Sequence, residues 1–187
     1  LVREKSKYYN FQEPLHVYVV ADASVFIWGK RPEGQLITVP AVEAELKDIR
    51  TRSLLAIFEA QVCSPTTQAR RAAQRAAEET GDIRSLSPAD LEVLALAVQY
   101  HADEANRRAN HDDDPEKGAC GVVLATDDYA LQNVALHLGL KIEPIGQPRI
   151  KRRLLHVQRC RGCGASFEGE ACPDCGTPAQ KKKRCKR

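Results

Sequence analysis

Residues 121–133 read GVVLATDDYALQN: an apolar run, then two adjacent aspartates, then a helical pattern. The run GVVLA predicts a buried strand. Asp127 and Asp128 come almost directly after it. A carboxylate in such a place either caps the helix that follows or holds a metal ion at the end of the strand. The choice between these interpretations depends on the acids elsewhere in the chain.

Strand and helix patterns alternate on both sides of this stretch. Strands are predicted within residues 16–24, 35–40 and 140–145, with a short one around Val62. Helical patterns occupy residues 40–49, 52–62, 65–81, 87–100 and 128–139. Such alternation predicts a central parallel sheet between two layers of helices, which is an α/β/α sandwich.

Composition divides the chain into parts of different character. We expect an N-terminal extension (1–14), an α/β domain (15–148) that includes a flexible loop (101–120), a basic linker (149–158), a cysteine-rich module (159–178) and a basic tail (179–187). No apolar run approaches the roughly 18–20 residues that span a bilayer. The charged and aromatic N-terminus is unlike a signal peptide. A cytoplasmic protein without a membrane partner is therefore expected.

Four of the seven cysteines form two C-x2-C pairs, Cys160 with Cys163 and Cys172 with Cys175, with eight residues between the pairs. This spacing supplies four thiolates for a tetrahedral zinc ion, and two disulfides are the alternative. Because protein ligands would fill all four positions, we expect a structural zinc ribbon. A module of about 20 residues cannot bury a core of its own, so the metal would supply its folding energy.

The C-terminal part of the chain is strongly basic. Residues 149–187 contain 12 Lys/Arg and 3 Asp/Glu, whereas residues 1–148 have a net charge of −6. A basic surface of this kind binds nucleic acid through its phosphates, and solubility alone is the other interpretation. The candidates for phosphate contacts are Arg152, Arg153, Arg159 and Arg161.

Several acids are expected at one edge of the sheet. Asp22 ends the first predicted strand, and ligands of parallel sheets bind at the carboxyl ends of the strands. Asp127 and Asp128 end a later strand, while Glu45 and Asp90 lie on helices that start near this edge. Clustered carboxylates repel one another, and a divalent cation such as Mg²⁺ or Mn²⁺ relieves the repulsion. Such a site can position water for attack on a phosphate.

Each acid also has an ordinary structural interpretation. Asp90 stands at the capping-box position of a helix that begins after Ser87. Asp22 and Asp127 are possible helix caps, and Glu45 can be simply solvated. At 100° per residue, Glu45 is predicted to lie nearer than Glu43 to the apolar face of its helix, which is made of Val42, Leu46 and Ile49.

The acids lie in segments that resemble a PIN-domain nuclease: VVADAS, SPADLEVLALA and TDDYALQN. The longer segments ELKDIRTR, GDIRSLSPADLEVLALAVQY and TDDYALQNVALHLGLKI, followed by a four-cysteine ribbon, resemble the Nob family of ribosome-assembly endonucleases. The resemblance covers about residues 15–178. It implies a PIN-like fold with a zinc ribbon, and the short chain without long insertions implies an archaeal member.

The resemblance implies a metal-dependent endoribonuclease that cuts precursor small-subunit (16S) rRNA at its mature 3′ end during ribosome biogenesis. Asp22, Glu45, Asp90 and Asp128 take the acidic positions and would bind Mg²⁺ or Mn²⁺. The family pattern Thr-x-Asp selects Asp128, which leaves Asp127 to cap the helix or to support the site from behind. The implied partners are the precursor rRNA, the assembling small subunit and further assembly factors.

Other residues are assigned to RNA on the same basis. Lys47, Arg50 and Arg52 are expected to hold the RNA backbone near the site. Gln132 and Asn133 either contact RNA or cap and solvate their own helix. Two further interpretations stay open: a PIN scaffold without activity that binds RNA or ribosomes, and a toxin-like PIN ribonuclease with another RNA target.

Overall fold

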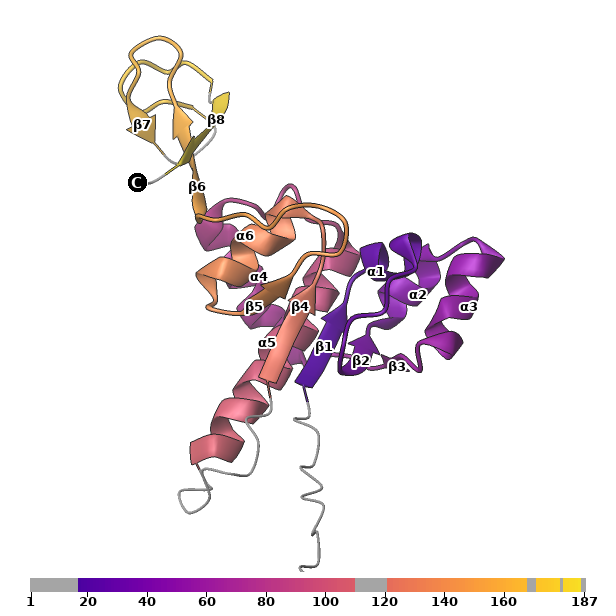
Figure 1. The fold of residues 1–187 in the computed structure, drawn as a ribbon. Helices are drawn as coiled ribbons and strands as arrows, with labels where there is room; N and C mark the ends of the chain where they lie inside the picture. The colour runs from indigo at the N-terminus through magenta and orange to yellow at the C-terminus, as the bar shows by residue number, and fades with distance from the viewer. Residues whose placement is uncertain (1–16, 110–120, 168–170, 179, 186–187) are drawn as a thin grey trace, which may run out of the picture.

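The computed structural model describes residues 17–109, 121–167, 171–178 and 180–185 (Figure 1). The expected N-terminal extension and residues 110–120 of the expected loop lie outside this part of the chain. The first part of that loop, residues 101–109, continues a long helix instead. A helical start of this segment was one of the expected alternatives, and weak apolar periodicity did not prevent helix formation there.

A five-stranded sheet forms the centre of the nuclease-like part of the chain. Its strands are β1 (Val17–Ala21), β2 (Gln35–Thr38), β3 (Gln61–Val62), β4 (Gly121–Ala125) and β5 (Lys141–Glu143). Their order is β3-β2-β1-β4-β5, and every neighbouring pair is parallel. The prediction of a central parallel sheet is thus confirmed.

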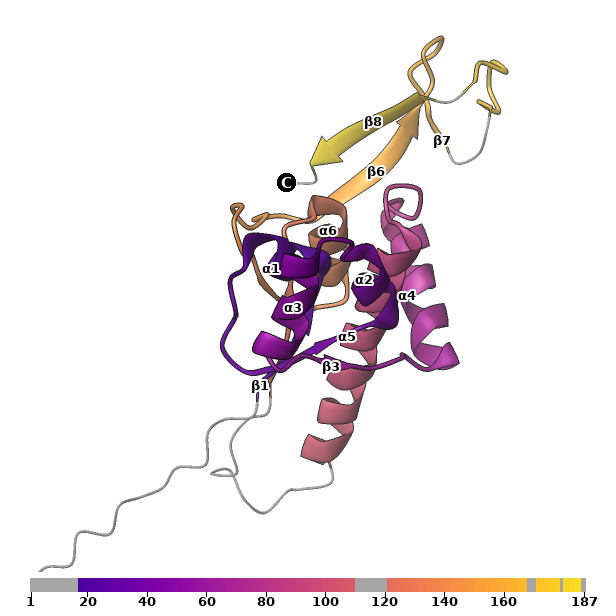
Figure 2. The same ribbon diagram turned by 90° about the vertical axis from the view of Figure 1, so that its right-hand side faces the viewer.

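Helices lie on both sides of this sheet. They are α1 (Ala23–Trp28), α2 (Pro40–Glu45), α3 (Ile49–Ile57), α4 (Thr67–Thr80), α5 (Pro88–Ala109) and α6 (Tyr129–His137). Figure 2 shows α4 and α5 on one side and α1 and α3 on the other. Helix α4 ends where its sequence predicts, because Gly81 adopts a left-handed φ of 77°.

The two central strands carry the acids to one place. In the register of β1 and β4, Ala21 lies opposite Ala125, so Asp22 and Thr126 follow at the same edge of the sheet. Val19, Val20 and Leu124 of these strands are fully buried. Burial of such apolar side chains fixes the register, and the register in turn fixes the positions of the acids.

A second, antiparallel sheet contains the cysteine-rich module. Its strands are β6 (Leu154–Arg159), β7 (Ser166–Phe167) and β8 (Gln180–Cys185), in the order β7-β6-β8. The expected basic linker and basic tail therefore pair with each other, with His156 opposite Lys183. In Figure 1 this sheet rises from the end of the molecule at which β1 and β4 terminate. Within the described residues, no helix is both long and apolar enough to cross a membrane.

Candidate active site and zinc site

Asp22 is the most deeply placed acid at the carboxyl end of the sheet, with 8% of its surface exposed. Its Oδ1 accepts a hydrogen bond of 2.6 Å from the backbone N–H of Ala23, so that Asp22 caps α1. Burial raises the pKa of Asp22; hydrogen bonds from Thr126, Ala23 and Ser24 oppose the rise, and the negative charge of Asp90 adds to it. A cation beside Asp22 would relieve this unfavourable charge.

Asp90 forms the capping box that its sequence predicts. Its Oδ2 accepts from the backbone N–H of Ser87 at 2.8 Å, and its own N–H donates to the Ser87 hydroxyl at 3.1 Å. The same half-buried carboxylate is near enough to Asp22 to raise the pKa of that residue. The capping and active-site interpretations of Asp90 are therefore compatible.

Two hydroxyl side chains connect the ends of β1 and β4. Thr126 Oγ1 donates to Asp22 Oδ2 at 2.9 Å and accepts from the backbone N–H of Asp128 at 3.1 Å. Ser24 Oγ donates to the same Asp22 oxygen at 3.3 Å and accepts from the backbone N–H of Asp127 at 3.4 Å. Thr126 and Ser24 were not among the predicted site residues, although the Thr-x-Asp spacing contains the signal for Thr126.

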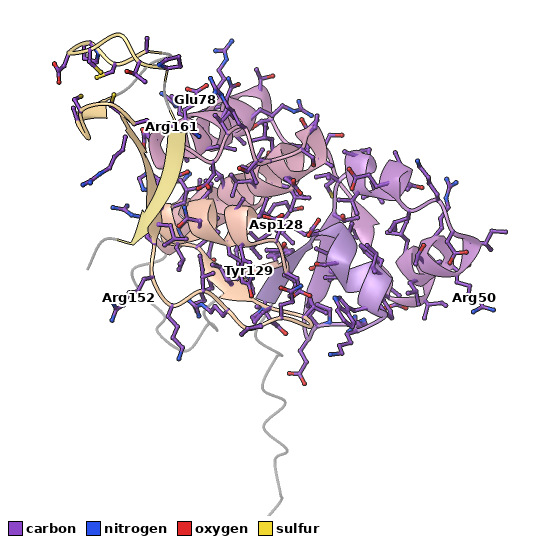
Figure 3. All side chains as sticks on the ribbon, turned by 90° about the horizontal axis from the view of Figure 1, so that it is seen from above. Arg50, Glu78, Asp128, Tyr129, Arg152 and Arg161 are labelled. Carbon is purple, nitrogen blue, oxygen red and sulfur yellow. The ribbon has the colours of Figure 1, made fainter. Side chains whose placement is uncertain are left out.

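The two adjacent aspartates have different structural roles. Asp128 is the N-cap of α6, with its Oδ1 accepting from Leu131 N–H at 2.8 Å. Its carboxylate is exposed, and Figure 3 shows it in the middle of the face seen from above. Of the two roles expected for Asp127, capping of this helix is excluded, because Asp128 is the N-cap and α6 begins at Tyr129.

Asp127 is 9% exposed and binds the segment after β5. Its carboxylate accepts backbone N–H groups from Ile145 at 2.8 Å, Gly146 at 2.9 Å and Gln147 at 3.2 Å. Burial alone raises the pKa of Asp127, but these three groups and the Trp28 side chain lower it below its ordinary value overall. The carboxylate of Asp127 thus anchors the start of the segment after β5, and its role in supporting the site stays a prediction.

Glu45 does not lie on the buried face that helical spacing predicts. Helix α2 ends at Glu45, and a new helix begins at Ile49 because Asp48 caps it. Ile49 is therefore exposed, and Glu45 is exposed as well, whereas Glu43 is half-buried. The geometric argument for Glu45 was wrong, and its assignment to the metal site depends on the family register alone.

The cations near α3 form a peripheral group. Lys47 and Arg50 are exposed, and Arg52 lies 3.6 Å from Glu43 in an exposed ion pair. In Figure 3, Arg50 lies at the outer edge of the molecule, well to the side of Asp128. These side chains are accessible to an anion, and their contact with RNA stays a prediction.

Gln132 and Asn133 are not surface residues, with 0% and 1% of their area exposed. Gln132 Nε2 donates to the carbonyl of Thr126 at 3.0 Å. Asn133 Nδ2 donates to Asp82 Oδ2 at 2.6 Å and to the carbonyl of Leu154 at 2.7 Å. Their assignment to direct RNA contact was wrong, since their position on the inner side of α6 turns these amides into the protein.

The remaining arginines differ in availability. Arg152 and Arg161 are exposed. Arg153 is exposed as well, and its guanidinium contacts His137 Nδ1 at 2.7 Å. Arg159 is half-buried, and its Nε has no hydrogen-bond partner in the described part of the chain.

The four cysteines of the ribbon converge on one point. Their Sγ atoms are separated by 3.1 Å (Cys160 and Cys175), 3.6 Å (Cys163 and Cys172) and 3.7 Å (Cys163 and Cys175). These distances exceed the roughly 2.05 Å of a disulfide bond. They approach the separation of about 3.8 Å expected for a tetrahedron with Zn–S bonds of about 2.3 Å. The geometry fits a metal ion.

The thiols of the ribbon influence one another strongly. Hydrogen bonds from the backbone of Cys163 and the side chain of Cys175 lower the pKa of Cys160 to about 6. For Cys163, the backbone of Ala165 lowers the pKa, but neighbouring thiols and burial together raise it to about 12. Four adjacent thiolates therefore need a cation before all can ionise.

The carboxylates converge less closely than the thiols. Among the described residues, only the four cysteines bring at least three potential ligand atoms within 4.8 Å of one another. Asp22, Asp90 and Asp128 instead surround the end of β1 and β4, connected through Thr126 and through the charge interaction of the first two. All of these donors are oxygen atoms, which suit Mg²⁺ or Mn²⁺.

A family model described as the PIN domain of ribonuclease matches residues 19–100. Together with the parallel sheet and the acids at its carboxyl edge, this match defines a PIN-domain ribonuclease. Nucleases of this class use divalent metal ions.

Curated relatives make the classification narrower. The chain is 38% identical over 174 residues to endoribonuclease Nob1 of Pyrococcus abyssi, which covers 89% of this chain and 94% of the relative. It is 36% identical over 160 residues to endoribonuclease Nob1 of Archaeoglobus fulgidus, with 86% and 87% covered. Ribonuclease VapC3 of Aeropyrum pernix is 38% identical over 130 residues. The chain belongs to the Nob1 family and is an endoribonuclease, so its substrate is RNA.

Proposed function

We propose that this endoribonuclease cleaves precursor small-subunit (16S) rRNA at its mature 3′ end during ribosome biogenesis. The observation that carries the proposal is the arrangement of Asp22, Asp90 and Asp128 around the end of β1 and β4, in a chain that also holds a four-cysteine site. Membership of the Nob1 family supports the choice of RNA, and the separate basic sheet supports a large structured substrate.

Asp22, Asp90 and Asp128, with Glu45 from the family register, would hold Mg²⁺ or Mn²⁺. The bound ion would supply a water of lowered pKa and would stabilise the negative charge that develops on the scissile phosphate. Thr126 and Ser24 hold Asp22 Oδ2 through hydrogen bonds of 2.9 and 3.3 Å, which fixes the orientation of that carboxylate. The carboxylate of Asp128 is exposed in the middle of the face seen in Figure 3, where it would be accessible to RNA.

The cysteine site would hold Zn²⁺ in a purely structural role, because Cys160, Cys163, Cys172 and Cys175 fill all four positions of a tetrahedron. The paired basic strands β6 and β8 next to it would dock on the assembling small subunit. Cysteines that bind zinc as thiolates, without disulfide bonds, suit a reducing compartment, which supports a cytoplasmic location.

A ribonuclease with another RNA target is the second candidate. The similarity to ribonuclease VapC3 of Aeropyrum pernix, 38% over 130 residues, favours it. The basic sheet and the cysteine site favour the ribosomal substrate, because they provide a second surface for RNA beside the nuclease domain. A scaffold without activity is disfavoured, since Asp22, Asp90 and Asp128 are all present at the sheet edge.

Cleavage of a defined RNA tests the proposal. In the presence of Mn²⁺, the protein should cut an RNA that spans the mature 3′ end of small-subunit rRNA at that junction, as mapped by primer extension. The matched control is an RNA of equal length and composition with the junction shuffled. Equal cutting of both RNAs would contradict the ribosomal target. Cutting by an Asp22→Asn variant would contradict the metal site.

A further inference from the structure

Residues 145–153 run without regular secondary structure from just after β5 to β6, and we call them, together with Leu154 at the start of β6, the strap. Asp127 binds the backbone N–H groups of the first three residues. Lys30 Nζ donates to the carbonyl of Ile145 at 3.1 Å. A Cβ added at Gly146 would meet Trp28 Cε2 at 2.6 Å, so the indole lies directly against the strap. The beginning of the strap is therefore fixed beside the end of β4.

The rest of the strap is attached along α6. Gln132 Oε1 accepts from Ile150 N–H at 3.0 Å. Asn133 Oδ1 accepts from Leu154 N–H at 2.6 Å, and its Nδ2 donates to Leu154 O at 2.7 Å. His137 contacts Arg153 as described above, and its Nε2 lies 2.7 Å from Glu79 Oε2. Successive side chains between Asp127 and His137 thus hold successive parts of one segment.

Gln132 also connects the strap to the catalytic edge. Its amide donates to the carbonyl of Thr126, whose hydroxyl donates to Asp22. The side chain is fully buried, so each of its hydrogen bonds would leave an unsatisfied polar group if it were lost. The position of the strap is in this way tied to the position of Asp22.

The strap directs its charged side chains outward. Ile150 and Leu154 are half-buried, whereas Arg149, Lys151 and Arg152 are exposed. Figure 3 shows Arg152 at the outer edge of the view, on the opposite side of Asp128 from Arg50. Cations held on a fixed backbone suit a phosphodiester chain, because phosphate contacts set the position of a nucleic acid on a protein without reading its sequence.

We propose that the strap is a fixed track for the backbone of single-stranded RNA beside the catalytic edge, with Arg149, Lys151 and Arg152 on the phosphates. Gln132 is the positioning residue that aligns this track with Asp22. The inference rests on the nuclease function and is independent of which RNA is cut.

Salt-dependent binding of a 12-nucleotide oligouridylate to the full chain, without added divalent cation, tests the track. Each phosphate contact with a single strand contributes about 0.7 to the slope of log K against log salt. The triple variant Arg149→Gln, Lys151→Gln, Arg152→Gln should lower the slope by about 2 and weaken binding roughly tenfold near 0.15 M salt.

Two single variants provide a matched control. Lys151→Gln removes a cation of the strap, whereas Lys141→Gln removes an exposed cation at the opposite end of the sheet. A wild-type slope in the triple variant, or an equal loss in the two single variants, would overturn the track.

The role of Gln132 is tested without any change of charge. Gln132→Met removes both amide hydrogen bonds and keeps a similar volume. We expect the Ile150 amide to exchange faster with solvent and the salt slope to fall toward that of the triple variant. Ile150→Pro removes the same hydrogen bond from the strap side, outside the core, and should act in the same way if Gln132→Met does not fold. Faster exchange with a wild-type slope would show that Gln132 is merely structural.

Discussion

At the scale of single residues, the site depends on hydroxyl groups that donate in one direction and accept in the other. Thr126 donates to Asp22 and accepts from the backbone of Asp128, so one side chain sets the distance between the ends of two strands. Its complete burial removes competition from water. The Thr-x-Asp spacing therefore has a physical reason: threonine spans the strand ends, and the residue two positions later starts the helix.

Exchanging each adjacent aspartate for asparagine should separate their roles. Asparagine caps a helix about as well as aspartate, so Asp128→Asn should leave stability within about 0.5 kcal/mol while reducing cleavage by about 100-fold or more through loss of a charged ligand. Asp127→Asn should instead cost about 1–3 kcal/mol, because the carboxylate binds three backbone N–H groups. Single-turnover cleavage and urea unfolding measure the two effects. A larger loss of cleavage in Asp127→Asn than in Asp128→Asn would reverse the assignment.

Asp22→Asn should stabilise the protein in the absence of added Mg²⁺ or Mn²⁺. The folded-state pKa of Asp22 is raised by burial, so the folded protein binds this proton more tightly than the unfolded chain does. The corresponding stability is present below the unfolded pKa and is lost as the pH rises through the folded pKa. At pH 7 the ionised carboxylate thus opposes folding, and the variant should gain about 1 kcal/mol.

Urea unfolding between pH 5 and pH 8 checks this linkage. The advantage of Asp22→Asn should shrink toward the acidic end, and Mn²⁺ should stabilise the wild-type protein but not the variant. The effect of Asp127 on stability has the opposite sign. Its folded-state pKa is lowered, so its ionised carboxylate stabilises the folded protein at neutral pH, and this stabilisation is lost as the pH falls. If Asp22→Asn is less stable than wild type at pH 7 without added metal, the ionised carboxylate of Asp22 does not oppose folding.

At the scale of elements, local signals predicted the helices that carry their own caps. The start of α5 is fixed by short-range contacts among Ser87, Pro88 and Asp90, which are recognisable as a capping box in the sequence. The break between α2 and α3 was predicted a few residues too late, because the apolar spacing of Val42, Leu46 and Ile49 continues through a cap formed by Asp48. Periodicity alone cannot locate the boundary between two consecutive helices.

The amides of α6 show a different limit of prediction. Polar residues on a helix next to a site suggest contact with a ligand, but Gln132 and Asn133 bind backbone groups 18 and 21 residues further along the chain. Only the folded structure brings those groups to α6. Local sequence patterns therefore do not predict the strap, although the residues of α6 that bind it lie in a recognisable helix pattern.

The start of the strap offers a spectroscopic test at this scale. Trp28 is the only tryptophan of the chain, and it packs against Gly146 while 53% of its surface stays exposed. Gly146→Ala should push the indole away from Asp127, shift the fluorescence emission to longer wavelength and cost about 1 kcal/mol. Gln147→Ala is the control, because it keeps the backbone N–H that Asp127 binds. Unchanged emission in Gly146→Ala would mean that the strap and the indole are not in contact in solution.

At the scale of the whole molecule, the described residues form two hydrophobic centres of unequal size. The large core includes Val20, Leu94 and Leu124 on both sides of the five-stranded sheet. The small one consists of Cys160 and Cys172 with Ala165 packed against them. The sheet follows from apolar patterning, and the ribbon follows from the spacing of its cysteines. The pairing of β6 with β8 did not follow, because the basic run KKKR in β8 has no strand-like alternation.

The double variant Cys160→Ser, Cys163→Ser should lose zinc, and the nuclease domain should stay folded. We expect about one zinc per wild-type chain, because the four Sγ atoms fit a single tetrahedron. The small centre is too slight to fold the ribbon without metal, whereas the large core does not depend on it. Metal analysis should therefore show loss of zinc. Amide exchange should show loss of protection at positions 160 and 164, whose N–H groups form the turn, while the melting temperature of the large core stays within a few degrees of the wild-type value.

Cys63→Ser is the matched control. This half-buried thiol lies on the nuclease domain beside Tyr100, so its replacement should leave the zinc in place. A ribbon that keeps its amide protection after zinc is lost would contradict the structural role of the metal.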